Sequence, residues 1–264
     1  MDADRSGYWS YSRISTYLSC SLSWYFRYIS DEEPAAVSSN LLLGSAVHFG
    51  HELLYKGMMK GNIPDLPEIL EQVSDDILIR KKINPPILFK DGEDIDTLIE
   101  EAQRLTECLY NSAKPEKIIA VDLQENVPLL EDGESILLPL KVIYDLIVET
   151  ADGEEIIVDL KTTRCRFSNQ KLEWDNQPSC YLYARKVSGG NGIKRSFRYD
   201  CLLKNKTPKF LQYHTNRNQS DFERLIAIIK MVDRGVRSGV FLPNRSSFFC
   251  GTCPWDQLCR NWRG

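Results

Sequence analysis

Three charged residues stand inside two apolar segments near the middle of the chain and are the first candidates for chemistry. Asp145 lies in one segment, and Asp159 and Lys161 lie in the next, after an Asp152-Gly153 turn signal. Two apolar runs separated by Asp-Gly predict a β-hairpin in the middle of a sheet. A carboxylate in a buried strand is costly unless it is paired or binds a metal. These three charges therefore need a common explanation.

The geometry of a strand predicts how the three charges meet. Asp159 and Lys161 leave the same face about 7 Å apart, with Leu160 on the other face. A two-residue turn would put Asp145 opposite Leu160, so we predict an odd-length loop or a bulge that sets Asp145 opposite Asp159 or Lys161. Two carboxylates suit Mg²⁺ or Mn²⁺, and a nearby ammonium group offsets charge during phosphodiester hydrolysis. The alternative is an ordinary Asp159–Lys161 ion pair with Asp145 at a solvated edge.

The segments around this hairpin predict both helices and further strands. Apolar residues at helical spacing predict the helices, and apolar, β-branched runs predict the strands. The dense aromatic residues of the first helices indicate core packing more than a base-stacking surface. Helices are expected within residues 10–28 and over 41–59, 67–82, 94–112, 176–187 and 219–238, and strands over 118–130, 198–203 and 210–214.

Several polar residues on these elements are further site candidates. His48 and His51 are three apart on one helix, and each is either a structural histidine or a metal ligand. Gln177 and Tyr181 are four apart on a later helix and share a face. Glu125 falls near the end of the strand that leads into the hairpin.

The net charge of −4 hides an asymmetry between the two parts of the chain. Residues 1–160 hold 13 Lys and Arg against 30 Asp and Glu, whereas residues 161–264 hold 20 against 7. Such a difference suggests that one face meets a polyanion such as DNA. The candidate contacts are Arg164, Arg166, Lys171, Lys194, Arg195, Arg198, Lys204, Lys206 and Lys209.

Composition also indicates where in the cell the protein is expected. The sequence has no run of eighteen apolar residues and no cationic start followed by an apolar segment, so we expect neither a membrane span nor a signal peptide. The expected location is the cytoplasm, where eight cysteines are not expected to form a disulfide framework.

Three cysteines close together near the end of the sequence predict a metal centre. Cys250, Cys253 and Cys259 include a Cys-x-x-Cys spacing and are one ligand short of a closed tetrahedral or cluster site. Cys20 is the best candidate for the fourth ligand, because its helical segment would need fastening to the other end of the chain. The alternatives are Cys108, Cys165, Cys180 and Cys201, and residue count leaves both zinc and iron–sulfur open.

Taken together, these motifs resemble the PD-(D/E)XK nucleases of the RecB and AddB type. The resemblance is greatest to the iron–sulfur branch with the CRISPR spacer-acquisition nucleases and phage recombination exonucleases. It covers nearly the whole chain, and its six motifs occur in the family's order. They are the segment 12–20, the segment 44–48, Asp145, the segment 159–161, the segment 177–181 and the three terminal cysteines.

The resemblance implies a role for each matching residue. His48 would be an additional metal ligand beside Asp145 and Asp159, and Lys161 would be the catalytic lysine. Gln177 and Tyr181 would support the site and the DNA backbone. A [4Fe–4S] cluster would be held by Cys20, Cys250, Cys253 and Cys259, clamping the N- and C-terminal segments together.

The sequence departs from the family at three places. Val142 stands where the family usually has glycine, and Ser21 stands where it often has proline. The family's upstream catalytic glutamate is best matched by Glu125, ahead of Glu131. Neither Val142 nor Ser21 is a ligand, so the implied assignments stay in place.

The resemblance implies an α/β fold with a mixed central sheet flanked by helices, and the resulting hypothesis is a single nuclease domain over residues 1–264. Its parts would be N-terminal helices (1–60), a helical lid (61–118), a nuclease core (119–215) and a C-terminal helix with the cysteines (216–264). It would be a Mg²⁺- or Mn²⁺-dependent exonuclease that acts on single-stranded DNA or free ends in repair, recombination or spacer processing, with an integrase, recombinase or helicase as a possible protein partner. The rivals are a catalytically silent iron–sulfur or zinc DNA-binding adaptor and an ordinary zinc-stapled DNA-binding protein.

Overall fold

A five-stranded mixed sheet forms the centre of the protein in a computed structural model that describes residues 7–30, 32–83, 85–113, 117–190 and 192–263. The strand order is β3-β6-β7-β8-β9, in which the β7–β8 pair is parallel and the other pairs are antiparallel. The strands of this sheet are β3 (Lys117–Val127), β6 (Leu140–Glu149), β7 (Glu155–Thr163), β8 (Arg195–Leu203) and β9 (Lys209–Thr215).

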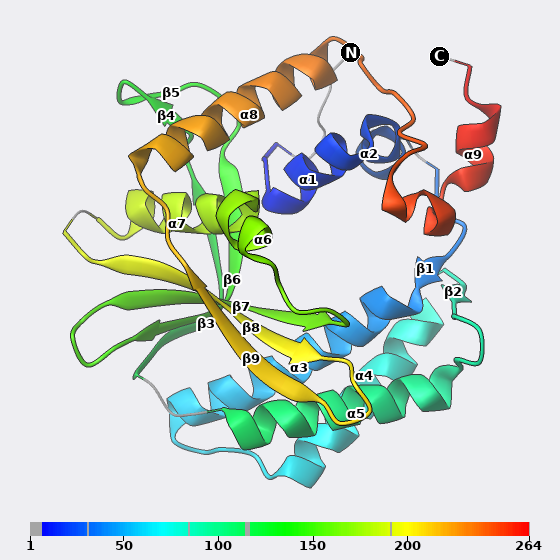
Figure 1. Cartoon of the computed structure of the whole chain (residues 1–264), viewed down its shortest axis with the longest axis vertical. Helices are drawn as coiled ribbons and strands as arrows, with labels where there is room; N and C mark the ends of the chain where they lie inside the picture. The colour runs from blue at the N-terminus through cyan, green and yellow to red at the C-terminus, as the bar shows by residue number, and fades with distance from the viewer. Residues whose placement is uncertain (1–6, 31, 84, 114–116, 191, 264) are drawn as a thin grey trace.

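Helices cover both faces of this sheet (Figure 1). On one face α3, α4 and α5 enclose an apolar core with Leu160 and Leu202 of the sheet. On the other face α1, α7 and α8 pack against large aromatic residues such as Tyr144 and Phe197. The predicted mixed α/β fold with flanking helices is therefore confirmed. The helices are α1 (Tyr11–Ser19), α2 (Ser21–Tyr28), α3 (Ser39–Lys60), α4 (Leu66–Ile83), α5 (Ile95–Ser112), α6 (Asn169–Trp174), α7 (Asn176–Ser188), α8 (Gln219–Arg237) and α9 (Asp256–Asn261).

The smaller elements lie outside the central sheet. Two short sheets pair β1 (Val37–Ser38) with β2 (Ile87–Leu88) and β4 (Leu130–Glu131) with β5 (Glu134–Ser135), and a 3₁₀ turn, η1, covers Phe248–Thr252. In the described part of the chain no helix is both long and apolar enough to cross a lipid bilayer.

The aromatic residues of the N-terminal helix pair belong to the core, as predicted. Trp9 and Trp24 are both almost fully buried, with ring centroids 6.3 Å apart. The rings of Trp24 and Phe241 also stack, at 6.0 Å, so the N-terminal helices pack on the segment that follows α8. Such aromatic contacts bury a large apolar area without leaving a base-stacking surface.

The central hairpin has the odd-length loop that the sequence predicted. Residues 150–154 connect β6 to β7, and the register runs from Glu149 opposite Glu155 to Leu146 opposite Val158. The next step of this register brings Asp145 level with Asp159. The regular pairing ends at Leu146 and Val158, one residue before Asp145, because the side chains of β6 stop alternating regularly between the two faces of the sheet there.

Both β6 and β3 are irregular at the same level of the sheet. Tyr144 and Ile147 pack in the same core under α7, although residues three apart in a regular strand face opposite sides. In β3, Val121 packs on the α3 side while Leu123 packs on the α7 side. Between them Asp122 has a φ of 53°, which is unusual for a residue other than glycine. Each strand therefore kinks at its aspartate, as a β-bulge would produce.

Candidate functional site

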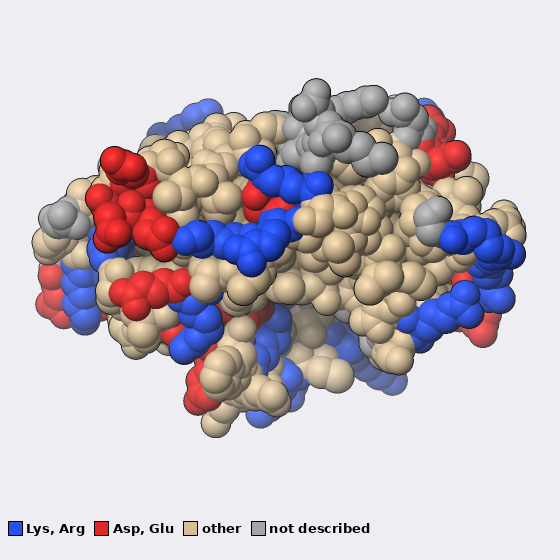
Figure 2. All heavy atoms as spheres, turned by 90° about the horizontal axis from the view of Figure 1, so that it is seen from above, with Lys and Arg blue, Asp and Glu red and all other residues tan. Residues whose placement is uncertain are grey.

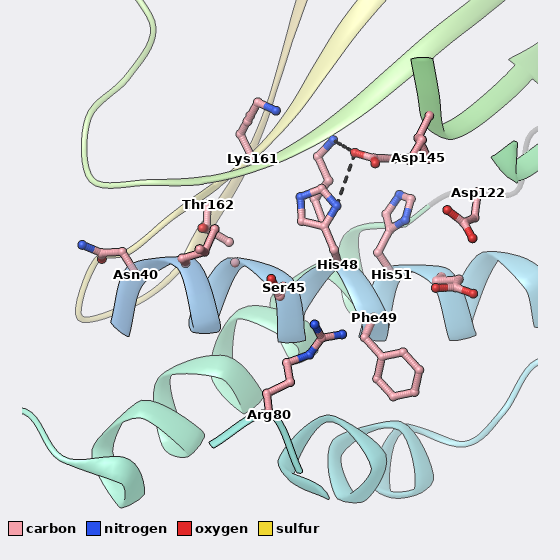
Figure 3. A pocket seen from close by; sticks show the side chains of 15 residues that line it. Asn40, Ser45, His48, Phe49, His51, Arg80, Asp122, Asp145, Lys161 and Thr162 are labelled. Atoms are coloured by element: carbon pink, nitrogen blue, oxygen red, sulfur yellow. Dashed lines mark hydrogen bonds and ion pairs between the residues drawn. The ribbon is translucent and has the colours of Figure 1, made fainter. Parts of the chain in front are cut away.

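A pocket of about 680 Å³ opens between α3 and the kinked part of the sheet (Figure 3). Helix α3 contributes Asn40, Ser45, His48 and His51 to its wall, all on one side of the helix. Strands β3, β6 and β7 form the opposite wall, and Arg80 of α4 lines a further side. The sheet residues that line the pocket are Asp122, Ile143, Asp145, Leu160, Lys161 and Thr162.

Asp145 is held from two directions at the kink of β6. One carboxylate oxygen, Oδ2, accepts a hydrogen bond from the Leu160 backbone N–H at 2.8 Å and lies 3.4 Å from His48 Nδ1. Burial alone would raise the pKa of Asp145, but His48 and Lys161 lower it to about 2. Burial lowers the pKa of His48, and the opposing effect of Asp145 is stronger, so the pKa of His48 is raised. The structure thus brings these two predicted residues together.

Asp159 forms a second pair with Lys161, whose Nζ lies 2.5 Å from Asp159 Oδ2. The other oxygen, Oδ1, accepts a hydrogen bond from Gln177 Nε2 at 2.6 Å, and the Gln177 side chain also hydrogen-bonds Tyr181. Burial raises the pKa of Asp159 to about 6, against the lowering effect of Lys161 and with a further increase from Asp145. Gln177 therefore positions the Asp159 carboxylate, which in turn positions the Lys161 ammonium group.

These donors have the chemistry of a divalent metal site. Two carboxylates and an imidazole suit Mn²⁺ or Mg²⁺ with water completing the coordination. Asp159 Oδ2 is buried and paired with Lys161, so a metal ion that bound this oxygen would have to share it with the ammonium group or displace that group. As the side chains stand, however, no three His, Cys, Asp or Glu groups among the described residues are arranged to hold a metal ion. His48 and Lys161 instead hold the two carboxylates as ion pairs.

His51 and Asp122 also reach the pocket. The sequence pattern left a ligand or a structural role open for His51, and Asp122 was missed. The His51 ring is 2% exposed and lies 4.6 Å from the Tyr55 ring, and its Nε2 has no hydrogen bond in the described part of the chain. Burial lowers the pKa of His51 to about 4, so this ring is neutral at physiological pH. A positive φ inside a strand has no sequence signature except the tolerance of Asp for that conformation.

Asp175 is a supporting residue that sequence reasoning did not identify. It is the N-cap of α7, accepting a hydrogen bond from the Gln177 backbone N–H at 3.0 Å. Its Oδ2 also accepts from Tyr199 at 2.9 Å and from Lys171 at 2.7 Å. An Asp before the first turn of a predicted helix with Pro178 in that turn was the available signal. Asp175 holds the helix end that carries Gln177.

Glu125 does not join the group around Asp145, contrary to the predicted catalytic set. It is absent from the pocket wall, and its carboxylate bonds Arg185 at 2.9 Å, Ser188 at 2.7 Å and Tyr144 at 2.9 Å. The alternative, Glu131, pairs with Lys230 at 2.7 Å on the molecular surface. Both glutamates have other partners, and neither lines this pocket.

Two of the predicted polyanion contacts are wrong because they are buried ion pairs. Arg195 lies 2.8 Å from Glu155, and Arg198 lies 2.8 Å from Asp200, with each arginine side chain less than one tenth exposed. Lys194 pairs with Glu154 at 2.6 Å. In Figure 2 Lys and Arg form separate groups on the face shown, with acidic groups beside them. The opposite charges of the two chain halves therefore partly compensate each other across the fold.

The remaining predicted contacts stay near the surface of the protein. Lys171 pairs with Asp175, as described above, while Lys204 lies half-buried beside Asn40, 2.9 Å from its side-chain oxygen. The exposed members are Arg164, Arg166, Lys206 and Lys209.

The cysteines predicted as ligands belong to segments from the two ends of the chain, and α2 packs beside the α9 segment (Figure 1). Burial raises the pKa of the Cys253 thiol, and Cys20, Cys250 and Cys259 raise it further. Cys20, Cys253 and Cys259 pack against the same small apolar cluster, but as the side chains of the described residues stand they do not form a metal site. Leu22, Phe26 and Trp255 form an apolar core beside them.

The side chains of Cys20 and Ser21 accept hydrogen bonds from the C-terminal segment. Asn244 N–H donates to Cys20 Sγ at 3.4 Å, and Leu242 N–H donates to Ser21 Oγ at 2.7 Å. A proline at position 21 could not make this last hydrogen bond, so the departure from the resembled family adds a contact between the ends. Cys180 and Cys201 are buried within the sheet-side core, and Cys108 and Cys165 lie apart from the group.

Comparisons with known proteins agree with this architecture. The family model described as the PD-(D/E)XK nuclease superfamily matches residues 8–260. A solved structure from Eubacterium rectale named "Putative exonuclease" superposes with a TM-score of 0.55 at 17% identity, covering 98% of this chain and 89% of that one. The structure SSO0001 gives a TM-score of 0.38 at 12% identity, covering 96% and 94%. No curated protein matches the chain significantly.

Proposed function

Because the chain belongs to the PD-(D/E)XK nuclease superfamily, we propose that the pocket between α3 and the β6–β7 hairpin is the active site of a metal-dependent DNA nuclease. The observation that supports this most directly is the meeting of four groups from distant parts of the chain. His48, Asp145 and Lys161 line one open pocket in which His48 contacts Asp145, and Lys161 also contacts Asp159, which is buried beside the pocket wall. A purely structural role would not require buried charges beside an open pocket.

His48, Asp145 and Asp159 are the residues that would hold Mg²⁺ or Mn²⁺. Such an ion, when bound, supplies Lewis-acid polarisation of the phosphate and a more acidic attacking water. Lys161 places a positive charge beside the phosphate oxygens and stabilises the charge that develops there. Gln177 keeps Asp159 in place, and the Leu160 N–H orients Asp145. Tyr181 acts indirectly, through its hydrogen bond with Gln177.

We further propose that Cys20, Cys250, Cys253 and Cys259 hold a structural [4Fe–4S] cluster, as in the RecB and AddB type. Their proximity supports this assignment, because thiolates that raise one another's pKa are stabilised when they bind a metal centre. Zinc is the other occupant that four thiolates fit. Visible absorption and metal analysis of anaerobically purified protein separate the two, since bound zinc is colourless.

The biological role that follows from this proposal is digestion of DNA from a free end, with preference for a single strand. It would act in the cytoplasm in repair, recombination or CRISPR-type spacer processing, together with an integrase, recombinase or helicase. The name of the Eubacterium rectale neighbour is consistent with exonuclease activity.

The decisive experiment is digestion of single-stranded DNA labelled separately at each end, with Mn²⁺, with Mg²⁺ and with EDTA. Metal-dependent release of short products from one end supports the exonuclease, and the labelled end that is lost first gives the polarity. Circular single-stranded DNA is the matched substrate without ends and should resist digestion. If the protein binds DNA but cleaves neither substrate with any of these metals, it is an adaptor and the proposal is wrong.

A further inference from the structure

Asn40 lies at one end of the pocket wall of α3 (Figure 3), and a cluster of two lysines from outside that wall contacts its side chain. The Asn40 side-chain oxygen accepts hydrogen bonds from Lys90 Nζ at 2.7 Å and from Lys204 Nζ at 2.9 Å. These lysines are 114 positions apart in the sequence and come from the loop before α5 and the end of β8. Two ammonium groups thus share one neutral acceptor.

The charges of this cluster are not balanced locally. Glu93 and Glu101 are the acids that act on the cluster; Glu93 has its Oε1 3.4 Å from Lys90 Nζ, but its Oε2 is held by Ser39 and by the Lys90 backbone N–H. The Lys204 ammonium group makes a single hydrogen bond among the described residues, although it has three donors. Burial lowers the pKa of Lys204, and Lys90 and Arg164 lower it further, whereas Glu101 and Glu93 have the opposite effect. Unused donors and repelling cations favour binding of an anion.

Lys204 lies at the same end of the sheet as the proposed catalytic Lys161. The Lys204 backbone N–H donates to Thr163 O at 2.8 Å, which joins the end of β8 to the end of β7. Thr163 follows Lys161 by two residues, or about 7 Å along the strand. The carboxyl ends of parallel strands are the usual position of ligands in α/β sheets. A phosphate at Lys204 would therefore be a neighbour of the scissile phosphate on the same nucleic acid strand.

We propose that Asn40, Lys90 and Lys204 form a phosphate clamp that binds a backbone phosphate of single-stranded DNA next to the one cleaved. The proposal deepens the nuclease function and rests on it. The two ammonium groups would move from the Asn40 oxygen to the phosphate oxygens, and the Asn40 amide would keep them in register. The clamp fixes the path of the strand along α3, from the cation cluster toward His48.

The test is binding of a fluorescent poly-dT oligonucleotide in EDTA, measured by anisotropy over a series of salt concentrations. Each neutralised phosphate contributes about 0.7 to the slope of log affinity against log salt for a single strand. The double variant Lys90→Gln/Lys204→Gln should therefore reduce the slope by about 0.7. The matched control is Lys117→Gln/Lys230→Gln, which removes the same charge from exposed lysines paired with Glu149 and Glu131. An equal loss of slope in both double variants overturns the clamp.

A second variant and a modified substrate locate the effect. Asn40→Asp keeps both lysines and gives them a permanent anion, so it should weaken DNA binding as the double variant does. Replacing single phosphates by neutral methylphosphonates should weaken wild-type binding most at one position, and the double variant should be insensitive there. Normal cleavage without these effects refutes the clamp alone. If the variants and the methylphosphonates weaken DNA binding as expected but no cleavage occurs, the nuclease function is refuted and the phosphate clamp is supported.

Discussion

Replacing Asp145 by asparagine tests the electrostatics of the pocket separately from catalysis. Asparagine keeps an oxygen that can accept the Leu160 N–H and keeps the shape of the side chain, but it removes the charge that faces His48. The pKa of Asp145 is about 2, against an ordinary value of 3.8. That difference corresponds to about 2 kcal/mol of folding free energy at a pH where the carboxylate is ionised.

The pH window of this stabilisation follows from both partners. A lowered carboxyl pKa stabilises the folded protein above the ordinary pKa, and this effect is lost as the pH falls through about 2. The raised pKa of His48 contributes below its ordinary value of 6.5, and this contribution is lost as the pH rises through the raised value. The cost of Asp145→Asn should thus be largest between about pH 4 and pH 6.5.

The assay is urea unfolding of both proteins in EDTA under anaerobic conditions, at about pH 6 and about pH 9. We expect Asp145→Asn to lose about 2 kcal/mol near pH 6 and less near pH 9. Excess Mn²⁺ should then stabilise the wild-type protein by about 2.7 kcal/mol at a hundred times its dissociation constant, and should leave the variant unchanged.

The control for this experiment is Asp122→Asn, the same chemical change on the neighbouring strand of the same pocket. Asp122 lies half-exposed and 4.0 Å from Lys56, and asparagine tolerates its positive φ. It should show no loss confined to the lower pH. A cost of Asp145→Asn that is equal at both pH values, or that grows with pH, would refute the pairing of Asp145 with a protonated His48.

Three further predictions concern other parts of the protein. Asp159→Ala or Lys161→Ala should remove DNA cleavage but leave the visible absorption of the proposed iron–sulfur cluster, because the sheet site and the cysteines are separate. Parallel loss of colour would contradict this division. Cys253→Ser should remove that absorption and lower the thermal midpoint, whereas Cys165→Ser, at an exposed cysteine, should do neither. Glu155→Gln should cost about 3 kcal/mol near neutral pH in urea unfolding, because it leaves Arg185 and Arg195 without their shared carboxylate. The pKa of Glu155 is lowered, so this cost should shrink as the pH falls below its ordinary pKa of 4.5; a constant cost would contradict the ion pairs.

The sequence predicted local features of the fold well because they depend on local patterns. The period of two in β7 placed Asp159 and Lys161 on one face, and the need to bring Asp145 to them predicted the odd-length loop that residues 150–154 form. The predicted long helices match α3, α4, α5, α7 and α8 within a few residues, because their apolar faces repeat at helical spacing.

Charge was harder to interpret, because its effect depends on which residues the fold brings together. Arg195 and Arg198 are part of a basic half of the sequence, yet each meets a carboxylate inside the sheet. Glu125 occupies a suitable strand position for a catalytic acid, but its carboxylate forms an ion pair with Arg185 of α7. Lys90 lies in the acidic half and carried no signal in the sequence, although the fold places it beside Lys204. Pairing across the fold decides whether a charge is available to a ligand.

The position of the pocket follows from the two kinks in the sheet. A regular ladder would use the Leu160 N–H for pairing with β6 and would turn Asp145 into the layer under α7. Because of the irregularity at Asp145, the Leu160 N–H donates to the Asp145 carboxylate in place of a backbone carbonyl of β6. The Asp145 side chain thus replaces the backbone contact and also faces α3 in the pocket wall. The kink at Asp122 in β3 is level with it and allows the neighbouring strand to follow the bend. Backbone irregularity of this kind concentrates at functional sites because the surrounding packing must support it. The apolar layers under α7 and α3 provide that support, which is why the charged residues can be buried at the point where the strands part.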